Sequence, residues 1–212
     1  MSQPFDQSAQ VRLPGKLDKG LGEFWSTNPW TIVSDGHNLS AFERNRAFLN
    51  VRGEDFLDIS HLTGADSDGD GRSVVAADFR NVGMPDLIVR QVGGGPLLLY
   101  ENRLPRKHYL TVSLRGRTSN RQGIGARLTA SVGGRTLVRE LFPSNGFRSQ
   151  SPNQVHLGLA DDRTVDTLTI RWPSGKVQVL TGIAGDRHII VDEGKDGTDA
   201  IATVVPGKTI EP

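Results

Sequence analysis

The chain has 212 residues, of which 36% are hydrophobic, and its 25 glycines indicate many turns. Its 25 basic and 24 acidic residues give a net charge of +1, which excludes a globally basic nucleic-acid-binding protein and an acidic tail protein. The absence of cysteine excludes disulfides, cysteine-ligated zinc and thiol catalysis.

Short strands are the dominant predicted elements. Residues 1–36 are polar and rich in turn residues, and we expect an irregular lead-in there. Short apolar runs bounded by turn residues follow over 47–50, 56–59, 74–79, 87–89 and 97–100. Further strand patterns, several of them alternating apolar and polar residues, cover 110–115, 126–132, 135–141, 155–159, 165–172, 176–180 and 188–191. These patterns predict an all-β protein, with tight turns at Gly133-Gly134 and Pro173–Gly175.

One acidic loop has the spacing of a calcium site. Asp66, Asp68 and Asp70 occupy alternate positions, and a glycine stands at the sixth position of the loop. Ca²⁺ is a hard cation that takes several oxygen ligands, and this spacing lets three carboxylates converge on one ion. An EF-hand is excluded because its last ligand position holds Ala77 instead of glutamate. Two alternatives remain, a Ca²⁺ site or an ordinary solvated turn.

A second loop, Asp78–Asp86, is a poorer candidate for a metal site. Arg80 stands where a ligand would be expected, and an arginine beside a cation site is repulsive. We therefore expect the carboxylates at both ends of this loop to accept backbone N–H bonds within the turn.

Two regions resemble known families. Residues 66–89, flanked by the similar segments Asn45–Asn50 and Leu97–Asn102, resemble FG-GAP/VCBS-type propeller repeats. Residues 119–193 are similar to an ASPIC/UnbV domain. The motifs that carry this second resemblance are Ser119–Arg127, Gly146–Ser151, Val155–Leu159 and Val165–Gly175. Together, residues 37–193 resemble the C-terminal part of a cartilage-acidic-protein-like chain.

The resemblance implies a fold and a class of function. It implies a partial propeller-like FG-GAP/VCBS sheet over 37–105 and a β-sandwich-like ASPIC/UnbV domain over 106–193, followed by a polar tail over 194–212. Proteins of this kind are mostly exported and are regarded as calcium-binding, adhesion or matrix-type modules without a common catalytic activity. The implied location is extracellular or periplasmic. Residues 1–10 lack the apolar core of a signal peptide, which leaves a cytoplasmic protein as the alternative.

A loop between two predicted strands carries the candidate ligand-binding residues. Phe147, Arg148 and Gln150 supply an aromatic ring, a cation and an amide. This trio suits the recognition of a sugar or a peptide. The loop also suits a buried corner in which Phe147 fills the core, so both interpretations stay open.

The segment from Arg103 to Arg139 holds nine basic residues and no acidic residue. Such a segment could bind phosphate, nucleic acid or an anionic glycan. Its only aromatic residue besides histidine is Tyr109, which does not support stacking of single-stranded bases. We favour the interpretation that these cations line solvent-facing strands and pair with the acidic segment before them, and we predict no nucleic-acid partner.

These observations favour a non-enzymatic interaction or adhesion-type module that binds a protein or a glycan and has a loop stiffened by Ca²⁺. The alternative is an accessory structural subunit, which would associate with a protein partner or with itself through an open sheet edge. A third hypothesis is a metal-assisted hydrolase that uses Asp66, Asp68 and His61, although the sequence offers no nucleophile or base to anchor its site. No apolar run is long enough to span a membrane.

Overall fold

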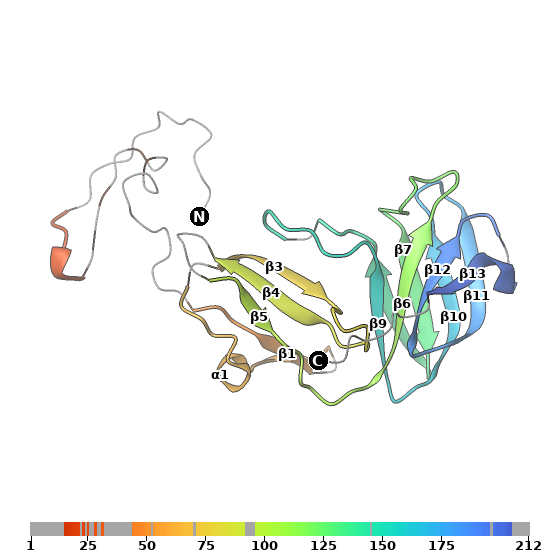
Figure 1. Ribbon diagram of the computed structural model, residues 1–212, viewed down its shortest axis with the longest axis horizontal. Helices are drawn as coiled ribbons and strands as arrows, with labels where there is room; N and C mark the ends of the chain where they lie inside the picture. The colour runs from red at the N-terminus through yellow and green to blue at the C-terminus, as the bar shows by residue number, and fades with distance from the viewer. Residues whose placement is uncertain are drawn as a thin grey trace. The chain divides into compact units, whose positions relative to one another are not determined.

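The computed structural model describes residues 15–21, 23, 25, 28, 31, 44–51, 53–69, 71–91, 96–144, 146–195 and 197–204. The chain divides into two compact units, Met1–Arg72 with Arg90–Leu97, and Ser73–Val89 with Leu98–Pro212. The all-β prediction is confirmed, because strands dominate the described residues (Figure 1).

The strands in chain order are β1 Phe48–Val51, β2 Asp55–Asp58, β3 Gly71–Ala77, β4 Asp86–Gln91, β5 Leu98–Tyr100, β6 His108–Arg115, β7 Arg127–Val132, β8 Arg135–Glu140, β9 Val155–Ala160, β10 Thr164–Arg171, β11 Val177–Ala184, β12 Arg187–Asp192 and β13 Ile201–Val204. The described helical elements are short and comprise η1 Lys19–Leu21, α1 Ser60–Thr63 and η3 Gly197–Ala200. The predicted strands agree with β1 to β12 within a few residues.

The first unit contains an antiparallel hairpin of β1 and β2. Leu49 pairs directly with Leu57, and Asn50 pairs with Phe56 on the opposite face of the hairpin. Every residue of both strands is exposed. The hairpin therefore presents apolar side chains on both of its faces.

A small sheet has the strand order β3-β4-β5 and occupies the region predicted to resemble propeller repeats. Several of its large apolar side chains are exposed, namely Val74, Leu87 and Leu99. Burial is concentrated near the strand ends, at Ala77, Asp86 and Gln91. The same alternation that marks these strands in the sequence therefore does not produce a buried apolar face within the described residues.

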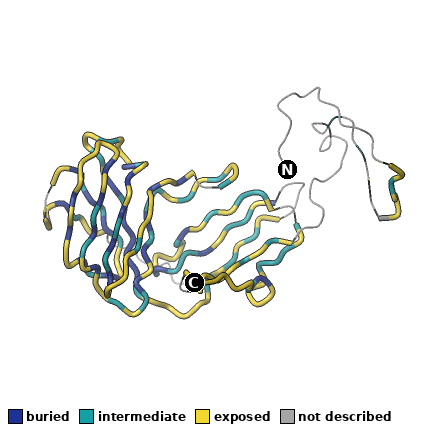
Figure 2. The backbone as a smooth tube through the Cα atoms, turned by 180° about the vertical axis from the view of Figure 1, so that it is seen from behind, coloured by how far each residue is buried: buried dark blue, intermediate teal, exposed yellow. Residues whose placement is uncertain are grey.

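The second unit contains a β-sandwich of two four-stranded sheets, with orders β11-β10-β7-β8 and β13-β12-β6-β9 (Figure 1). Strand β6 lies between β9, to which it is antiparallel, and β12, to which it is parallel. Alternate residues of the strands point inward and form one core, which includes Leu110, Val112, Leu128, Ala130, Leu157, Leu168, Ile170, Trp172, Ile189 and Val191. Figure 2 shows both buried and exposed positions along these strands.

Two predicted turns join neighbouring strands of the sandwich. Gly133 and Gly134 have φ values of 52° and 77°, as the tight connection between β7 and β8 requires. Gly175 has a φ of 88° in the turn between β10 and β11. Next to this turn, the buried Trp172 Nε1 donates to Gln178 Oε1 at 2.8 Å, so the indole satisfies its polar atom inside the core.

The C-terminal segment differs from the polar tail that the sequence predicts. Residues 201–204 form β13, which pairs antiparallel with β12 and extends its sheet. Ala200 joins the core, and Ile201 packs against it. No helix among the described residues has the length and apolar character needed to cross a membrane.

Candidate functional site

The predicted calcium loop carries ion pairs in the first unit. The Asp66 carboxylate lies 3.1 Å from Nη1 of Arg44 and 2.8 Å from Nδ1 of His61. Asp68 is exposed, and Asp70 lies outside the described residues. Within the described part of the chain, no three histidine, cysteine, aspartate or glutamate residues form a group that could hold a metal ion. The structure thus brings Asp66 together with a histidine and an arginine.

The Asp78–Asp86 turn is closed by its own carboxylates. Asp78 accepts N–H bonds from Val82 at 3.1 Å and from Gly83 at 2.6 Å, which confirms its expected role in the turn. The buried Asp86 accepts the N–H of Asn102 at 2.8 Å, so its partner follows β5 instead of lying within the turn.

Arg80 supplies a cation inside this turn. Its guanidinium lies 3.0 Å from the Asp86 carboxylate and 2.7 Å from that of Glu101. A buried carboxylate is costly unless it is paired, and Arg80 provides the pairing charge. The positive charge that a metal would bring to this loop is therefore already present as a guanidinium.

The loop with the predicted ligand-binding residues projects its aromatic ring into solvent. Phe147 is 62% exposed, so it does not fill the core. The guanidinium carbon of Arg148 lies 5.5 Å from the centroid of the Phe147 ring, within cation–π range. Gln150 is exposed. The structure thus places Phe147 and Arg148 together at the loop tip.

The same loop tip is fastened to β3 by two reciprocal hydrogen bonds. The Ser73 hydroxyl donates to the Phe147 carbonyl, and the Ser149 hydroxyl donates to the Val74 carbonyl at 3.2 Å. Each segment therefore supplies one side-chain donor and one backbone acceptor. This arrangement covers part of the free edge of β3 and fixes the loop base beside it.

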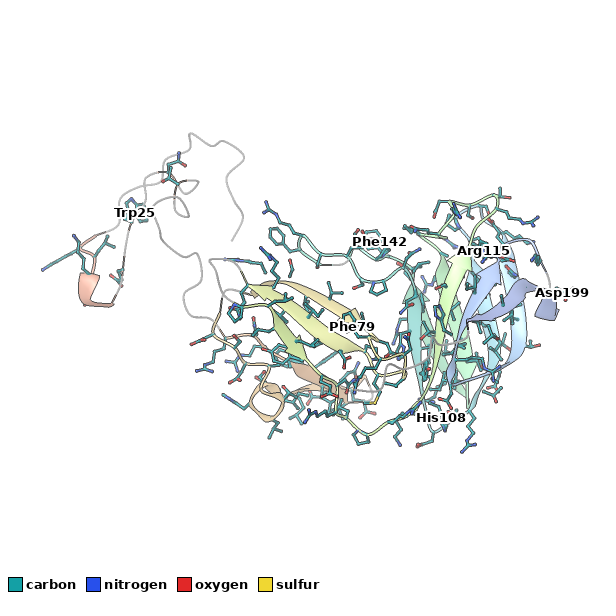
Figure 3. The ribbon with its side chains drawn as sticks, in the orientation of Figure 1. Trp25, Phe79, His108, Arg115, Phe142 and Asp199 are labelled. Carbon is teal, nitrogen blue, oxygen red and sulfur yellow. The ribbon has the colours of Figure 1, made fainter. Side chains whose placement is uncertain are left out.

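A cleft of about 170 Å³ lies at the base of this loop, between the end of β8 and the start of β9. Its lining residues are Arg139, Glu140, Leu141, Phe142, Pro143, Ser151, Pro152, Gln154, Val155 and His156. Phe142, which is labelled in Figure 3, follows the end of β8, and its side chain is 60% exposed. The cleft thus combines an apolar wall with charged and neutral polar groups, which is the usual composition of a small ligand site.

His156 is one of the polar residues that line the cleft. Its ring stacks on Tyr109, with the two centroids 5.7 Å apart and the planes inclined by 13°. Burial lowers the pKa of His156, with a smaller opposing effect from Asp78 and a further lowering by Arg139. The imidazole is therefore neutral at pH 7 and can donate or accept a hydrogen bond.

The cleft is the open end of a gap between two edge strands. β8 ends one sheet and β9 ends the other, and they lie on the same side of the sandwich. Arg135 closes the opposite end of the gap, because its Nη2 donates to the Leu159 carbonyl at 2.8 Å and pairs with Asp162 at 2.6 Å. Arg139 Nη1 donates to the Val138 carbonyl at 2.8 Å. A guanidinium group thus donates a hydrogen bond to a backbone carbonyl of each edge strand, β8 and β9.

A buried carboxylate organises another part of the sandwich. Glu193 is 1% exposed, and its Oε2 accepts N–H bonds from Arg117, Thr118 and Ser119 at 2.6, 2.9 and 2.9 Å. Its Oε1 accepts hydroxyl bonds from Ser119 at 2.9 Å and Ser174 at 2.7 Å. Burial alone would raise the pKa of Glu193, but these bonds lower it to about 2. Glu193 is therefore a structural anion that joins three distant segments.

Among the described residues, four of the nine cations of the basic segment pair with acids of the sandwich itself. The described pairs are Lys107–Asp161, Arg115–Asp192, Arg127–Glu140 and Arg135–Asp162. Only Arg103 pairs with the preceding acidic segment, through Glu101. The expected pairing of cations is therefore present, but its main partners differ from those expected.

The described fold and site define the class of structure, a β-sandwich with a surface cleft beside a loop. Residues 116–198 match the family model described as ASPIC and UnbV. The match runs from the residue after β6 into η3 and contains the whole lining of the cleft. It confirms the ASPIC/UnbV resemblance of residues 119–193. The FG-GAP/VCBS resemblance stays a prediction. No curated protein matches the chain.

Sequence reasoning missed the residues that line the cleft. It selected Phe147, Arg148 and Gln150 at the loop tip, whereas the lining comes from the loop base and two strand ends. Arg139 and His156 each look like ordinary polar positions on strands. The sequence offered one signal. A single loop joins the end of β8 to the start of β9, so these two strand ends must lie near each other.

Proposed function

We propose that this protein is a non-enzymatic interaction module that recognises a glycan or a protein partner at the β8–β9 cleft. One observation carries the proposal, which is the exposed Phe142 ring beside a concave site that also holds Arg139 and His156. An exposed aromatic group next to a few convergent polar groups is typical of ligand-binding surfaces.

The state of the acidic groups supports binding instead of catalysis. The carboxylates of Asp78 and Glu193 accept hydrogen bonds from backbone N–H groups, and the carboxylate of Asp86 forms an ion pair with Arg80. A carboxylate whose oxygens are already engaged by protein donors is poorly placed to exchange protons with a substrate.

Binding to an array of immobilised glycans tests this proposal. Wild type and Val179→Ala are expected to bind a common glycan, whereas Phe142→Ala loses most of that binding. Val179 is a matched control because it is an exposed apolar residue on β11, outside the cleft lining. Equal binding by all three proteins, or no binding by wild type, would contradict a glycan-recognition role for the cleft.

The second candidate function, an accessory subunit, has its own supporting observation. The β1–β2 hairpin exposes Phe48, Leu49, Phe56 and Leu57, and a two-stranded hairpin is marginal in water by itself. Sedimentation velocity at rising protein concentration tests this function. Association that is weakened in Leu49→Ser would favour it, and a monomer at all concentrations would oppose self-association.

Calcium binding at Asp66, Asp68 and Asp70 stays a prediction, as does an extracellular location. An ion at Asp66 would compete with the contacts of that carboxylate to Arg44 and His61. The thermal unfolding midpoint of chelator-treated protein should rise with Ca²⁺ but not with Mg²⁺ if the site exists. The rise should be absent in Asp68→Ala.

A further inference from the structure

We propose that the β8–β9 cleft takes a hexuronic acid unit of an acidic glycan, with the sugar carboxylate on Arg139. This inference rests on the proposed function and specifies its ligand. It follows from four properties of the cleft, namely its charge, its apolar wall, its size and the state of the neighbouring strand edges.

The charge of the cleft favours an anion. Glu140 also lines the cleft, and Arg127, which lies 3.7 Å from it outside the lining, partly offsets its negative charge. Arg139 has no ion pair among the described side chains, and its one hydrogen bond goes to the Val138 carbonyl. A guanidinium has five N–H donors, so Arg139 retains donors for a carboxylate, which it binds with geometric specificity.

The other lining groups suit the rest of a sugar. Phe142, Pro143 and Pro152 form an apolar wall, against which the C–H groups of a pyranose ring can pack. Among the polar lining residues, Gln154 offers an amide and the neutral His156 offers a ring nitrogen. Both groups can donate and accept hydrogen bonds, as hydroxyl groups require.

The size of the cleft suits a small ligand. Its volume of about 170 Å³ is below the range of roughly 300–1,000 Å³ that is usual for drug-sized ligands. We therefore expect one sugar unit in the cleft and the adjoining units outside it.

The strand edges argue against an extended peptide as the occupant. Peptides of that kind bind by adding a strand, which requires free backbone groups along an edge. Here the Val138 carbonyl of β8 is occupied by Arg139, and the Leu159 carbonyl of β9 is occupied by Arg135. Charged side chains at inward positions of an edge strand also oppose strand addition.

An NMR titration of the full ¹⁵N-labelled chain tests the inference. The probes are glucuronate, glucose as its neutral counterpart, acetate as the charge alone, and hexaglutamate as an acidic peptide. Glucuronate should shift the amide signals of residues 139–143 and 151–156, with a dissociation constant on the order of 1 mM for a ligand of this size. Glucose should bind about tenfold more weakly because it lacks the charged contact.

Two variants locate the charged contact. Arg139→Gln should reduce glucuronate binding to the level of glucose, while Arg171→Gln should leave it unchanged. Arg171 is a suitable control because it is an exposed arginine at the end of β10, outside the cleft lining. Unchanged amide spectra away from the substituted residue establish that each variant is folded.

The outcomes separate this inference from the proposed function. Equal binding of glucuronate and glucose at the cleft would overturn the uronate assignment and leave glycan recognition intact. Acetate or hexaglutamate binding as tightly as glucuronate would also overturn it, in favour of a bare anion site or a peptide site. No signal change at the cleft with either sugar would contradict the uronate assignment and the glycan-recognition part of the proposed function, and would leave a protein partner as its remaining form.

Discussion

The β-sandwich and the strands before it use the same alternating patterns but bury them to very different extents. In the sandwich, inward residues from two sheets form one core. Among the described residues, 17 large hydrophobic residues are exposed, and 12 of them lie from Phe48 to Leu104, before the sandwich. Alternation defines an apolar face, but only a second layer removes that face from water.

The largest test of this contrast compares one leucine from each region. Leu168 is 0% exposed in the sandwich core, and Leu57 is 55% exposed in the β1–β2 hairpin. Leu168→Ala should lower the free energy of unfolding by about 2–5 kcal/mol because it removes buried methyl groups and leaves a cavity. Leu57→Ala should change it by no more than about 0.5 kcal/mol.

Urea denaturation followed by circular dichroism measures both effects. A loss of more than about 2 kcal/mol in Leu57→Ala would break the contrast, because it would mean that this side chain is covered in solution.

The next largest expected effect on the free energy of unfolding comes from the hydrogen bonds to Glu193. The pKa of Glu193 is lowered from 4.5 to about 2 in the folded protein, and this difference corresponds to about 3 kcal/mol at neutral pH. Because the folded pKa is depressed, this stabilisation is present above pH 4.5 and is lost as the pH falls towards 2. Glu193→Gln should remove it at pH 7 and flatten the acid dependence of unfolding between these values.

Urea titrations of wild type and Glu193→Gln at pH 7 and pH 3 measure this effect. Glu140→Gln is the control, because Glu140 is exposed on β8. A Glu193→Gln protein as stable as wild type at pH 7 would contradict the structural role of this carboxylate.

Gly83 tests how the turn before β4 packs against Tyr109. Gly83 has a φ of 82°, and a Cβ atom there would overlap the Tyr109 ring. Gly83→Ala should therefore cost about 2 kcal/mol or more, from both the backbone conformation and the clash. Gly134 has a similar φ of 77°, but the space around it is open. Gly134→Ala should therefore lower the free energy of unfolding by only about 1 kcal/mol. Equal losses in thermal unfolding would show that the Tyr109 contact contributes nothing.

The smallest expected effect concerns the loop tip. Ser149→Ala removes the hydrogen bond to the Val74 carbonyl, which should cost about 0.5–1.5 kcal/mol. Amide hydrogen exchange should accelerate in residues 146–149 and in β3, while β10 keeps its protection. Unchanged exchange in both segments would mean that this contact does not hold the loop.

The sequence predicted the strands well and the tertiary contacts poorly. Alternation and glycine turns identify strands because both are local properties of neighbouring residues. The parallel pairing of β6 with β12 has no local signal, since the two strands are more than 70 residues apart. β13 was missed because a four-residue strand gains its stability from the sheet edge that it joins.

The candidate site shows the same limit. Phe147 was predicted as a ligand-binding residue from its loop alone, but Arg139 and His156 come to line one cleft only when β8 and β9 lie together. Glu193 is equally hidden, because its donors precede it by 74 to 76 residues. A single acidic residue after a strand otherwise indicates a surface position.

The position of β6 has a consequence for the order in which the chain folds. β6 is the first sandwich strand to be synthesised, yet its neighbour β12 begins 72 residues after the last residue of β6. Loop closure over such a distance slows folding, so most of the domain must emerge before its central strand is enclosed. During this interval the apolar strands before it are already synthesised, and exposed apolar strands are the feature that generally favours aggregation of incompletely folded chains.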